Sequence, residues 1–346
     1  MAGLRSNRSR QRAHYLAQSM LEQSHGNVES GIEFKLAGTS VALGWKLIDP
    51  LSELIAGAFW ESHSDSPDFR IALLRRSDPH TLPSLEWARP WIDKHQILPE
   101  QISYPYRIMI DRPQGLIQVF DTVNNVGAIY IRHEEELDSR SFITPFRLMW
   151  SWLANQFDGE IVHAASVLIQ DKGILLSGGS GSGKSTFAVH AASHGEMLIA
   201  DDCTLVHNSL LYPVFRRSKV SQATLQLIGS TKLIESSIAV TGLNGNGQSV
   251  KSIIDLSRSP LSVTAGVNLD AVLFPRVSPS LGSFQLTARQ AFERLTSDSL
   301  REIHGGGTRN RLRLARIARS VPSYRALLPP SLDQGLDGAL RLVTHV

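Results

Sequence analysis

Apolar runs alternate with turn residues over the first part of the chain, between residues 31 and 133. The segment "FKLAGTSVALGWKL" has a turn at Gly38 and Thr39, and "YRIMIDRPQGLIQVFDTVNNVGAIYIRHEE" contains three apolar runs separated by "RPQG" and "NNVG". Turn residues between strand-like runs are typical of an antiparallel meander. An inserted helix is predicted at "PLSELIAGAFW", which opens with Pro50. We therefore predict a small, mostly β domain of the α+β class over residues 29–140, and we interpret it as a scaffold or substrate-docking domain.

A segment with helical spacing follows, "FITPFRLMWSWLANQF", at residues 142–157. Phe146, Met149, Trp150 and Leu153 fall at positions i, i+3, i+4 and i+7, which predicts an amphipathic helix. We expect this helix to join the two halves of the chain and its aromatic side chains to pack in a core.

From residue 161 onward, short apolar strands alternate with helices. "IVHAASVLI" and "GILLSG" are predicted strands joined by the turn "QDKG", "KSTFAVHAASHG" is a helix ending at Gly195, and "EMLIADD" is the next strand. Further along, the pattern predicts strands at "NLDAVLFPRV" and "VPSYRALL", a basic helix at "RNRLRLARIARS" and a final helix near "SLDQGLDGALRLV". The order strand, glycine-rich loop, helix, strand is an α/β nucleotide-binding arrangement. It predicts an α/β domain over residues 141–346.

Composition and charge exclude several classes of protein. The 346 residues are 42% hydrophobic and 19% charged, enough for one large core or two ordinary ones. A net charge of +3 gives no strong field toward nucleic acid or membrane, and no apolar run approaches the roughly 18–20 residues of a membrane span. The single cysteine, Cys203, excludes an internal disulfide and fits a reducing compartment. We expect a cytoplasmic protein without nucleic-acid or membrane partners, for which a homo-oligomer remains possible.

The arginine-rich start, residues 1–28, has no apolar core of a secretory signal. Arginines recur in it at Arg5, Arg8, Arg10 and Arg12. We interpret it as a disordered basic tail that is solvated.

The most specific pattern in the chain is the glycine-rich loop "LLSGGSGSGKSTF", residues 175–187. Gly178, Gly183, Lys184 and Ser185 fit the phosphate-binding loop pattern in full. Its glycines let backbone N–H groups surround the β-phosphate, the lysine neutralises phosphate charge, and the serine places a hydroxyl on Mg²⁺ at a helix N-terminus. We predict that ATP and Mg²⁺ are held here by Gly178, Gly179, Ser180, Gly181, Ser182, Gly183, Lys184, Ser185 and Thr186.

Candidate catalytic side chains flank this loop in the sequence. Asp201 and Asp202 end an apolar strand 17 residues after Lys184, where a parallel strand would deliver carboxylates to the phosphate site. One carboxylate can bind the metal while the other accepts a proton from an attacking hydroxyl. His163 lies 21 residues before Lys184 on the strand that precedes the loop. Its spacing alone does not separate an active-site histidine from a packed core histidine.

Residues 161–206 resemble the catalytic domain of the HPr serine kinase family. The stretch "VHAASVLIQDKGILLSGGSGSGKSTFAVHAASHGEMLIADD" has the family's order of strand histidine, glycine loop, short helix ending in glycine, strand and double aspartate. The resemblance implies a P-loop fold with a mixed sheet, in which Lys184 and Asp201 are catalytic, with Asp201 as the base. It further implies that Asp202 joins Ser185 as a magnesium ligand and that His163 is a catalytic contact to phosphate or substrate. The family's glycine-flanked "EIRG" signature is absent from the corresponding region, "YPVFRRSKVSQATLQLIG", which argues against HPr as the substrate.

Residues 160–346 are more similar to the HPr-kinase-like proteins that are encoded with lasso-peptide maturation enzymes. The similarity lies in "YPVFRRSKV", "KSIIDL", "LFPRV" and "VPSYRALL". It implies an ATP-dependent serine kinase whose peptide substrate is phosphorylated on its C-terminal serine. The alternatives are a kinase for a small hydroxyl acceptor such as an amino acid or sugar, an HPr-like protein serine kinase, and a nucleotide-sensing module without turnover.

Five basic residues are candidates for contacts to phosphate or substrate. Arg216, Arg217 and Lys219 follow the aspartate strand, where they could stabilise phosphoryl charge or grip a substrate carboxylate. Lys251 follows "TGLNGNGQSV", a loop that could close over the nucleotide, and Arg276 ends a strand. Surface charge remains the alternative for each of them. The basic helix "RNRLRLARIARS" is interpreted as an amphipathic helix with a solvated face.

Overall fold

The computed structural model describes residues 2–25, 30–45, 50–62, 64–75, 85–90, 97–111, 115–132, 143–221, 224, 237–239, 251–256, 266–302 and 307–328. The chain divides into two compact units, each described by itself below. The first consists of Met1–Gly57, Glu61–Ser141 and Phe146–Gln156, and the second of Ala58–Trp60, Phe142–Pro145 and Phe157–Val346. This division differs from the predicted boundary at residue 140, because the helix after Phe146 belongs to the first unit.

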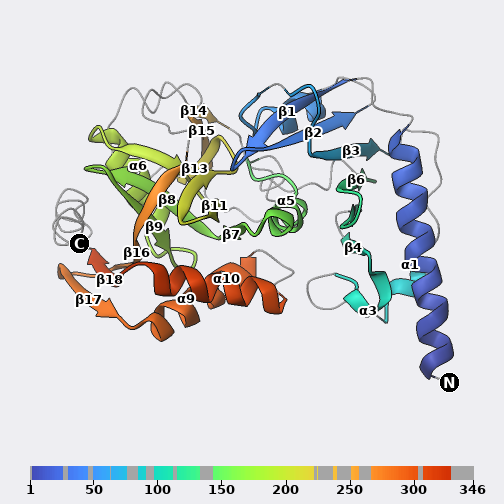
Figure 1. Ribbon diagram of the computed structural model, residues 1–346. Helices are drawn as coiled ribbons and strands as arrows, with labels where there is room; N and C mark the ends of the chain where they lie inside the picture. Colours follow the sequence, from blue (N-terminus) through green and yellow to red (C-terminus); the bar gives the residue numbers. More distant parts are fainter. Residues whose placement is uncertain are drawn as a thin grey trace. The chain divides into compact units, whose positions relative to one another are not determined.

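A six-stranded mixed sheet forms the first unit (Figure 1). Its strand order is β1 (Ser30–Leu36), β2 (Thr39–Trp45), β3 (Phe69–Arg75), β6 (Val126–Ile131), β5 (Leu116–Asp121) and β4 (Tyr106–Asp111). The predicted meander of β4, β5 and β6 is confirmed, and β3 runs parallel to both β2 and β6. Alternation along β5 sends Ile117 and Val119 into the core that contains the N-terminal helix. Gln118, between them, accepts a hydrogen bond of 3.1 Å from the backbone of Met149 in α5 (Arg147–Ala154).

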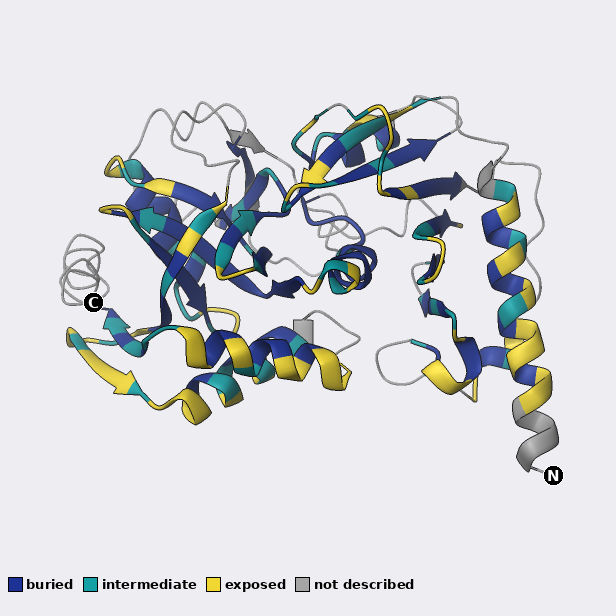
Figure 2. Ribbon diagram, viewed as in Figure 1, coloured by how far each residue is buried: buried dark blue, intermediate teal, exposed yellow. Residues whose placement is uncertain are grey.

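The N-terminal residues form a helix, so the prediction of a disordered tail is wrong for residues 2–25. Helix α1 (Ala2–His25) buries Ala13, Leu16, Ala17, Met20 and Leu21 in the same core as β4 and β5. Their spacing, i, i+3, i+4, i+7 and i+8, is the apolar stripe of an amphipathic helix. Arg8, Arg10 and Arg12 are exposed on the other face of the helix. These arginines were the reason for interpreting the segment as a solvated tail. Figure 2 shows buried and exposed residues alternating along α1.

The second unit contains a nine-stranded mixed sheet. Along the main path, the order is β10 (Met197–Ala200), β8 (Ala164–Ile169), β9 (Lys172–Ser177), β16 (Val267–Val277), β12 (Leu210–Pro213), β11 (Thr204–His207) and β7 (Glu160–Val162). Off this path, β18 (Ser323–Leu328) lies parallel to β16, and β17 (Gly282–Leu286) lies antiparallel to β18. Strand β8 is antiparallel to both β9 and β10, so β9 and β10 run in the same direction and end at the same edge.

Helices cover both faces of this sheet (Figure 1). Phe187 of α6 (Lys184–Ser193) packs with Leu176 and Leu273 on one face. On the other face, α9 (Ala288–Glu302) and α10 (Thr308–Ser320) pack on the strands through Leu295 and Leu314. A three-stranded antiparallel sheet, made of β13 (Arg217–Ser221), β15 (Lys251–Asp255) and β14 (Ser237–Ala239), adds side chains to the α6 core. The predicted α/β class with a mixed sheet is therefore confirmed for this unit.

Four further details concern individual segments. "IVHAASVLI" is not one strand, because β7 pairs with β11 while β8 pairs with β9, and the change of partner falls at His163. The predicted final helix and the loop "TGLNGNGQ" lie outside the described residues. Of the helices that the structure describes, none has both the length and the apolar character needed to cross a membrane. Short helical segments, α2 (Pro50–Ala56), α3 (Glu100–Ser103) and the 3₁₀ turns Glu86–Ala88 and Asn155–Phe157, complete the elements.

Candidate active site

The glycine-rich loop connects the end of β9 to the start of α6. Gly183, at the N-cap of α6, has φ = +98°, a left-handed conformation that side chains with a Cβ rarely adopt. A Cβ on Gly178 would lie 2.7 Å from Ser182 Oγ, so a larger residue there would collide with the loop itself. Gly183 therefore holds a backbone conformation that favours glycine, and a side chain at position 178 would require Ser182 to move, directly before the N-terminus of a helix.

Two polar groups inside the loop match the chemistry of a phosphate. The ammonium group of Lys184, a buried residue, donates hydrogen bonds to the carbonyl oxygens of Gly178 and Gly179. Among the described residues, no group bonds to the buried hydroxyl of Ser182. A hydroxyl and an ammonium facing the same loop are donors that phosphate oxygens accept. The residues present therefore fit a bound triphosphate.

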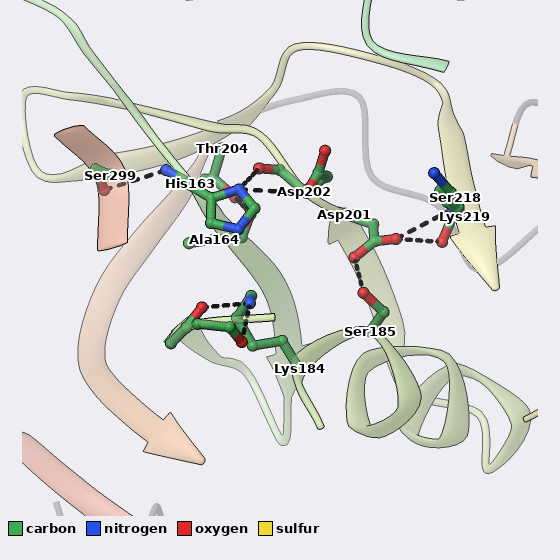
Figure 3. A network of polar contacts seen from close by, with 12 residues as sticks. His163, Ala164, Lys184, Ser185, Asp201, Asp202, Thr204, Ser218, Lys219 and Ser299 are labelled. Atoms are coloured by element: carbon green, nitrogen blue, oxygen red, sulfur yellow. Dashed lines mark hydrogen bonds and ion pairs between the residues drawn. The ribbon is translucent and has the colours of Figure 1, made fainter. Parts of the chain in front are cut away.

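Asp201, at the end of β10, holds the first helical serine (Figure 3). Ser185 Oγ donates to its Oδ1 at 2.8 Å, and Ser218 Oγ and the backbone N–H of Lys219 donate to its Oδ2 at 2.7 and 3.2 Å. The carboxyl group is buried, and this burial raises its pKa, with a further increase from the adjacent charge of Asp202. Asp201 thus fixes the orientation of the hydroxyl that was predicted to bind Mg²⁺.

Asp202 contacts a different partner, His163 (Figure 3). The Nδ1 atom of His163 lies 3.2 Å from Asp202 Oδ1 and 3.1 Å from the backbone oxygen of the same residue. Because both oxygens are acceptors, the contact requires a proton on Nδ1, and in the neutral form of the ring this tautomer leaves the lone pair on Nε2. Asp202 has φ = +66°, so this contact is made from a strained backbone. Its side chain is 36% exposed, whereas Asp201 is buried.

Sequence reasoning missed a third carboxyl group at the site. Asp298, a half-buried residue of α9, accepts a hydrogen bond of 3.4 Å from Ser177 Oγ at the end of β9. Burial raises its pKa, while the charges of Lys184 and His163 lower it, which places both groups within its electrostatic reach. The next residue, Ser299, accepts a hydrogen bond of 3.2 Å from the backbone N–H of His163. No helix was predicted at residues 288–302, and no sequence motif marks Asp298.

The predicted basic contacts fall in different places. Arg216 forms an ion pair of 3.6 Å with Asp255, and Arg217 is buried, which lowers the pKa of its guanidinium group. Lys219 contacts Asp201 through its backbone N–H group. The neighbouring Ser218, which also bonds to Asp201, was not among the predicted residues. The side chain of Lys251 lies outside the described residues. Arg276 is exposed at the end of β16, where it lines a hollow on the α9 side of the sheet.

Oxygen atoms predominate where a metal would bind. Ser185, Asp201 and Asp202 provide hydroxyl and carboxylate oxygens of the kind that Mg²⁺ prefers, and a loop-bound magnesium ion takes its other ligands from phosphate and water. Within the part of the chain that the structure describes, no three His, Cys, Asp or Glu side chains gather into a metal cage. The donor set therefore fits Mg²⁺ carried by a nucleotide.

The fold and site define an α/β protein with a glycine-rich loop followed by paired aspartates. No family model and no curated protein matches the sequence. Its structure is similar to the Hpr(Ser) kinase/phosphatase from Coxiella burnetii, with 14% identity, over 54% of this chain and 99% of that chain, at a TM-score of 0.27. That overlay is loose and does not indicate a function for this chain.

Proposed function

We propose that the protein is an ATP- and Mg²⁺-dependent kinase that phosphorylates a serine hydroxyl, at the C-terminus of a peptide. The observation that carries this proposal is the meeting of three features at one edge of the sheet. These are the phosphate-binding loop, the Ser185–Asp201 contact and the His163–Asp202 pair. MgATP supplies the phosphoryl group and a cation that offsets its charge.

In this proposal, the residues of the glycine-rich loop bind the triphosphate and orient it. Lys184 bonds to carbonyl oxygens of its own loop, so it can exchange these partners for phosphate oxygens without leaving a buried charge unpaired. Ser185, held by Asp201, keeps its oxygen directed to the cation site. In this arrangement the positions of the donors are fixed before the reaction, which is the main source of electrostatic catalysis.

Two groups are candidates for the proton acceptor. The family resemblance implies Asp201, and burial raises the pKa of its carboxyl group, which makes the carboxylate a stronger base. However, both oxygens of Asp201 already accept hydrogen bonds from protein groups, and the residue is 1% exposed. The geometry favours Nε2 of His163, because Asp202 fixes the tautomer and orientation of the ring as the carboxylate does in a catalytic triad. We therefore propose that His163 takes the proton of the acceptor hydroxyl and that Asp202 orients it.

The acceptor class is tested by offering several hydroxyl compounds to the protein with MgATP. Peptides ending in serine, the same peptides ending in alanine, free serine and a sugar are incubated and examined by mass spectrometry. The proposal expects one added phosphate on the terminal serine only. Phosphate on free serine or on the sugar would instead support the small-molecule alternative, and phosphate on none would contradict the proposed peptide acceptor.

A further inference from the structure

A hollow of about 450 Å³ lies on the α9 side of the sheet in the second unit. Arginines from three elements line it: Arg276 from β16, Arg325 from β18 and Arg294 from α9. Gln285 and Gln290 add amide groups, and among the described residues no aspartate or glutamate lines the hollow. The fold therefore concentrates positive charge at one place.

Strand register explains why these arginines meet. Arg325 is opposite Phe274 of β16 and Phe284 of β17, and Arg276 is opposite Leu327, two residues further along the same face. The guanidinium carbon of Arg294 lies 6.0 Å from the centre of the Phe274 ring, above this face. Within the described residues, neither Arg276 nor Arg325 forms an ion pair. Three nearby cations with apolar neighbours favour binding of an anion.

The rim of the hollow favours a peptide over a small ion. Phe284, a large apolar residue that lines the hollow, has 57% of its surface exposed. Among the described residues, β17 pairs with β18 alone, so its other edge offers unpaired backbone groups. An extended peptide can add to such an edge through main-chain hydrogen bonds while its side chains enter adjacent pockets.

The hollow and the phosphate-binding loop are both in contact with the end of β16. A Cβ on Gly183 would lie 3.5 Å from Val277 Cγ2, and a Cβ on Gly178 would lie 3.8 Å from the backbone oxygen of Pro275. Arg276, between Pro275 and Val277, lines the hollow. One short segment of β16 thus borders both sites.

We propose that this hollow is the docking site of the acceptor peptide, which lies along β17 and places a carboxylate among Arg276, Arg294 and Arg325. The inference rests on the proposed kinase function, whose acceptor it describes. It moves carboxylate recognition away from residues 216–219, because Arg216 pairs with Asp255 and Arg217 is buried. Asp298, one turn from Arg294 on α9, interacts electrostatically with both Arg294 and Lys184.

The test measures binding without turnover, in the full-length protein. The probes are three fluorescently labelled peptides: Leu-Phe-Ser with a free C-terminus, the same peptide amidated, and amidated Leu-Phe-Asp, whose carboxylate is on the side chain. Inorganic phosphate is added as a competitor. Arg325→Gln and Arg276→Gln remove one charge each, and Arg311→Gln, at an exposed position of α10, is the matched control. Thermal melting confirms that every variant is folded.

We expect the free-acid peptide to bind at least about 10-fold tighter than its amide, since a hydrogen bond to a charged group is worth at least this factor. Arg325→Gln and Arg276→Gln should each remove most of that difference, and Arg311→Gln should keep it. Tight binding of amidated Leu-Phe-Asp would show that the hollow also accepts a side-chain carboxylate, and this result would support the docking site as well. Equal affinity for acid and amide, or equal effects of all three variants, would overturn the inference, as would binding of phosphate but no peptide.

Failure of this inference is distinguishable from failure of the proposed function. If peptides are phosphorylated but their binding ignores Arg276 and Arg325, the kinase proposal stands and the docking site is wrong. If the peptides bind with the expected dependence but no phosphate is transferred, the docking site stands and the kinase proposal is wrong.

Discussion

The two adjacent aspartates at the end of β10 have different surroundings, and we infer different roles for them from this difference. Asp201 is buried and accepts three hydrogen bonds, one of them from Ser185. Asp202 is partly exposed and pairs with His163. Asp201, whose oxygens are all occupied by hydrogen bonds, can hold other groups in position. His163, which is oriented by a carboxylate, can exchange a proton.

This difference predicts separate effects of the two amide substitutions. Asp202→Asn and His163→Gln should lower single-turnover phosphoryl transfer by about 10²–10⁴-fold, the usual range for a general base, with nucleotide binding largely unchanged. Asp201→Asn should mainly raise the Mg²⁺ concentration needed for half-maximal transfer, because Ser185 loses its charged acceptor. Rapid-quench assays across a Mg²⁺ titration measure both quantities.

The opposite pattern would restore the assignment that the family resemblance implies. If Asp201→Asn lost 10²-fold or more at saturating Mg²⁺ while Asp202→Asn stayed near the wild-type rate, Asp201 would be the base. Melting curves of the variants control for misfolding.

At the scale of single elements, α1 is the clearest case in which charge concealed a pattern. Its apolar stripe is present in the sequence, yet the arginines between the stripe positions resemble those of a solvated tail. The helix is stable because its stripe packs in the core of the first unit. A helix of this kind is identified only when periodicity is weighed before composition.

Packing of α1 predicts a large loss of stability on truncation of Leu16, which is 0% exposed. Leu16→Ala should lower the free energy of unfolding by about 2–5 kcal/mol, the usual cost of such a cavity. Tyr15→Ala, next to it and 64% exposed, should change it by less than about 0.5 kcal/mol. Urea unfolding measures both, and equal small effects would mean that the helix is not docked.

Packing of α10 on β7 buries a titratable group. Asn310 donates to both carboxyl oxygens of Glu160 at 3.0 Å, and Arg313 lies 3.8 Å from Glu160 and 2.9 Å from Asp158. Burial raises the pKa of Glu160 to about 8, although Asn310 and Arg313 act in the opposite direction. The folded state thus holds a proton that the unfolded state releases near pH 4.5.

That proton predicts how stability changes with pH. The contribution of Glu160 is fully present below about pH 4.5 and is lost as pH rises toward 8, because the folded state binds more protons in this range. Glu160→Gln should remove this decline, on the order of a few kcal/mol between pH 5 and 8. Urea unfolding at both pH values compares it with the wild type and with Glu293→Gln, an exposed control. An unchanged slope in Glu160→Gln would show that Glu160 is ionised in the folded protein.

At the scale of the whole molecule, local patterns predicted more than contacts between distant segments. The meander, the α/β unit and the loop were readable because turns, strand lengths and glycine spacing are local signals. The approach of Asp298 to Ser177, and of Ser218 to Asp201, depends on the packing of α9 and β13, which no local pattern specifies. Long-range packing also explains why Arg216 pairs with Asp255 while Arg276 lines the hollow beside α9.

The central claim is that the site transfers phosphate from ATP to a hydroxyl, and the fate of the γ-phosphate tests it most directly. The protein is mixed with ATP labelled on the γ-phosphate, Mg²⁺ and a peptide ending in serine, and the products of a single turnover are separated. We predict label on the peptide, and none with Lys184→Ala, which removes charge from the transition state. Label released only as free phosphate would indicate an NTPase, and label remaining on ATP would indicate a nucleotide-binding module; either result would contradict the kinase assignment.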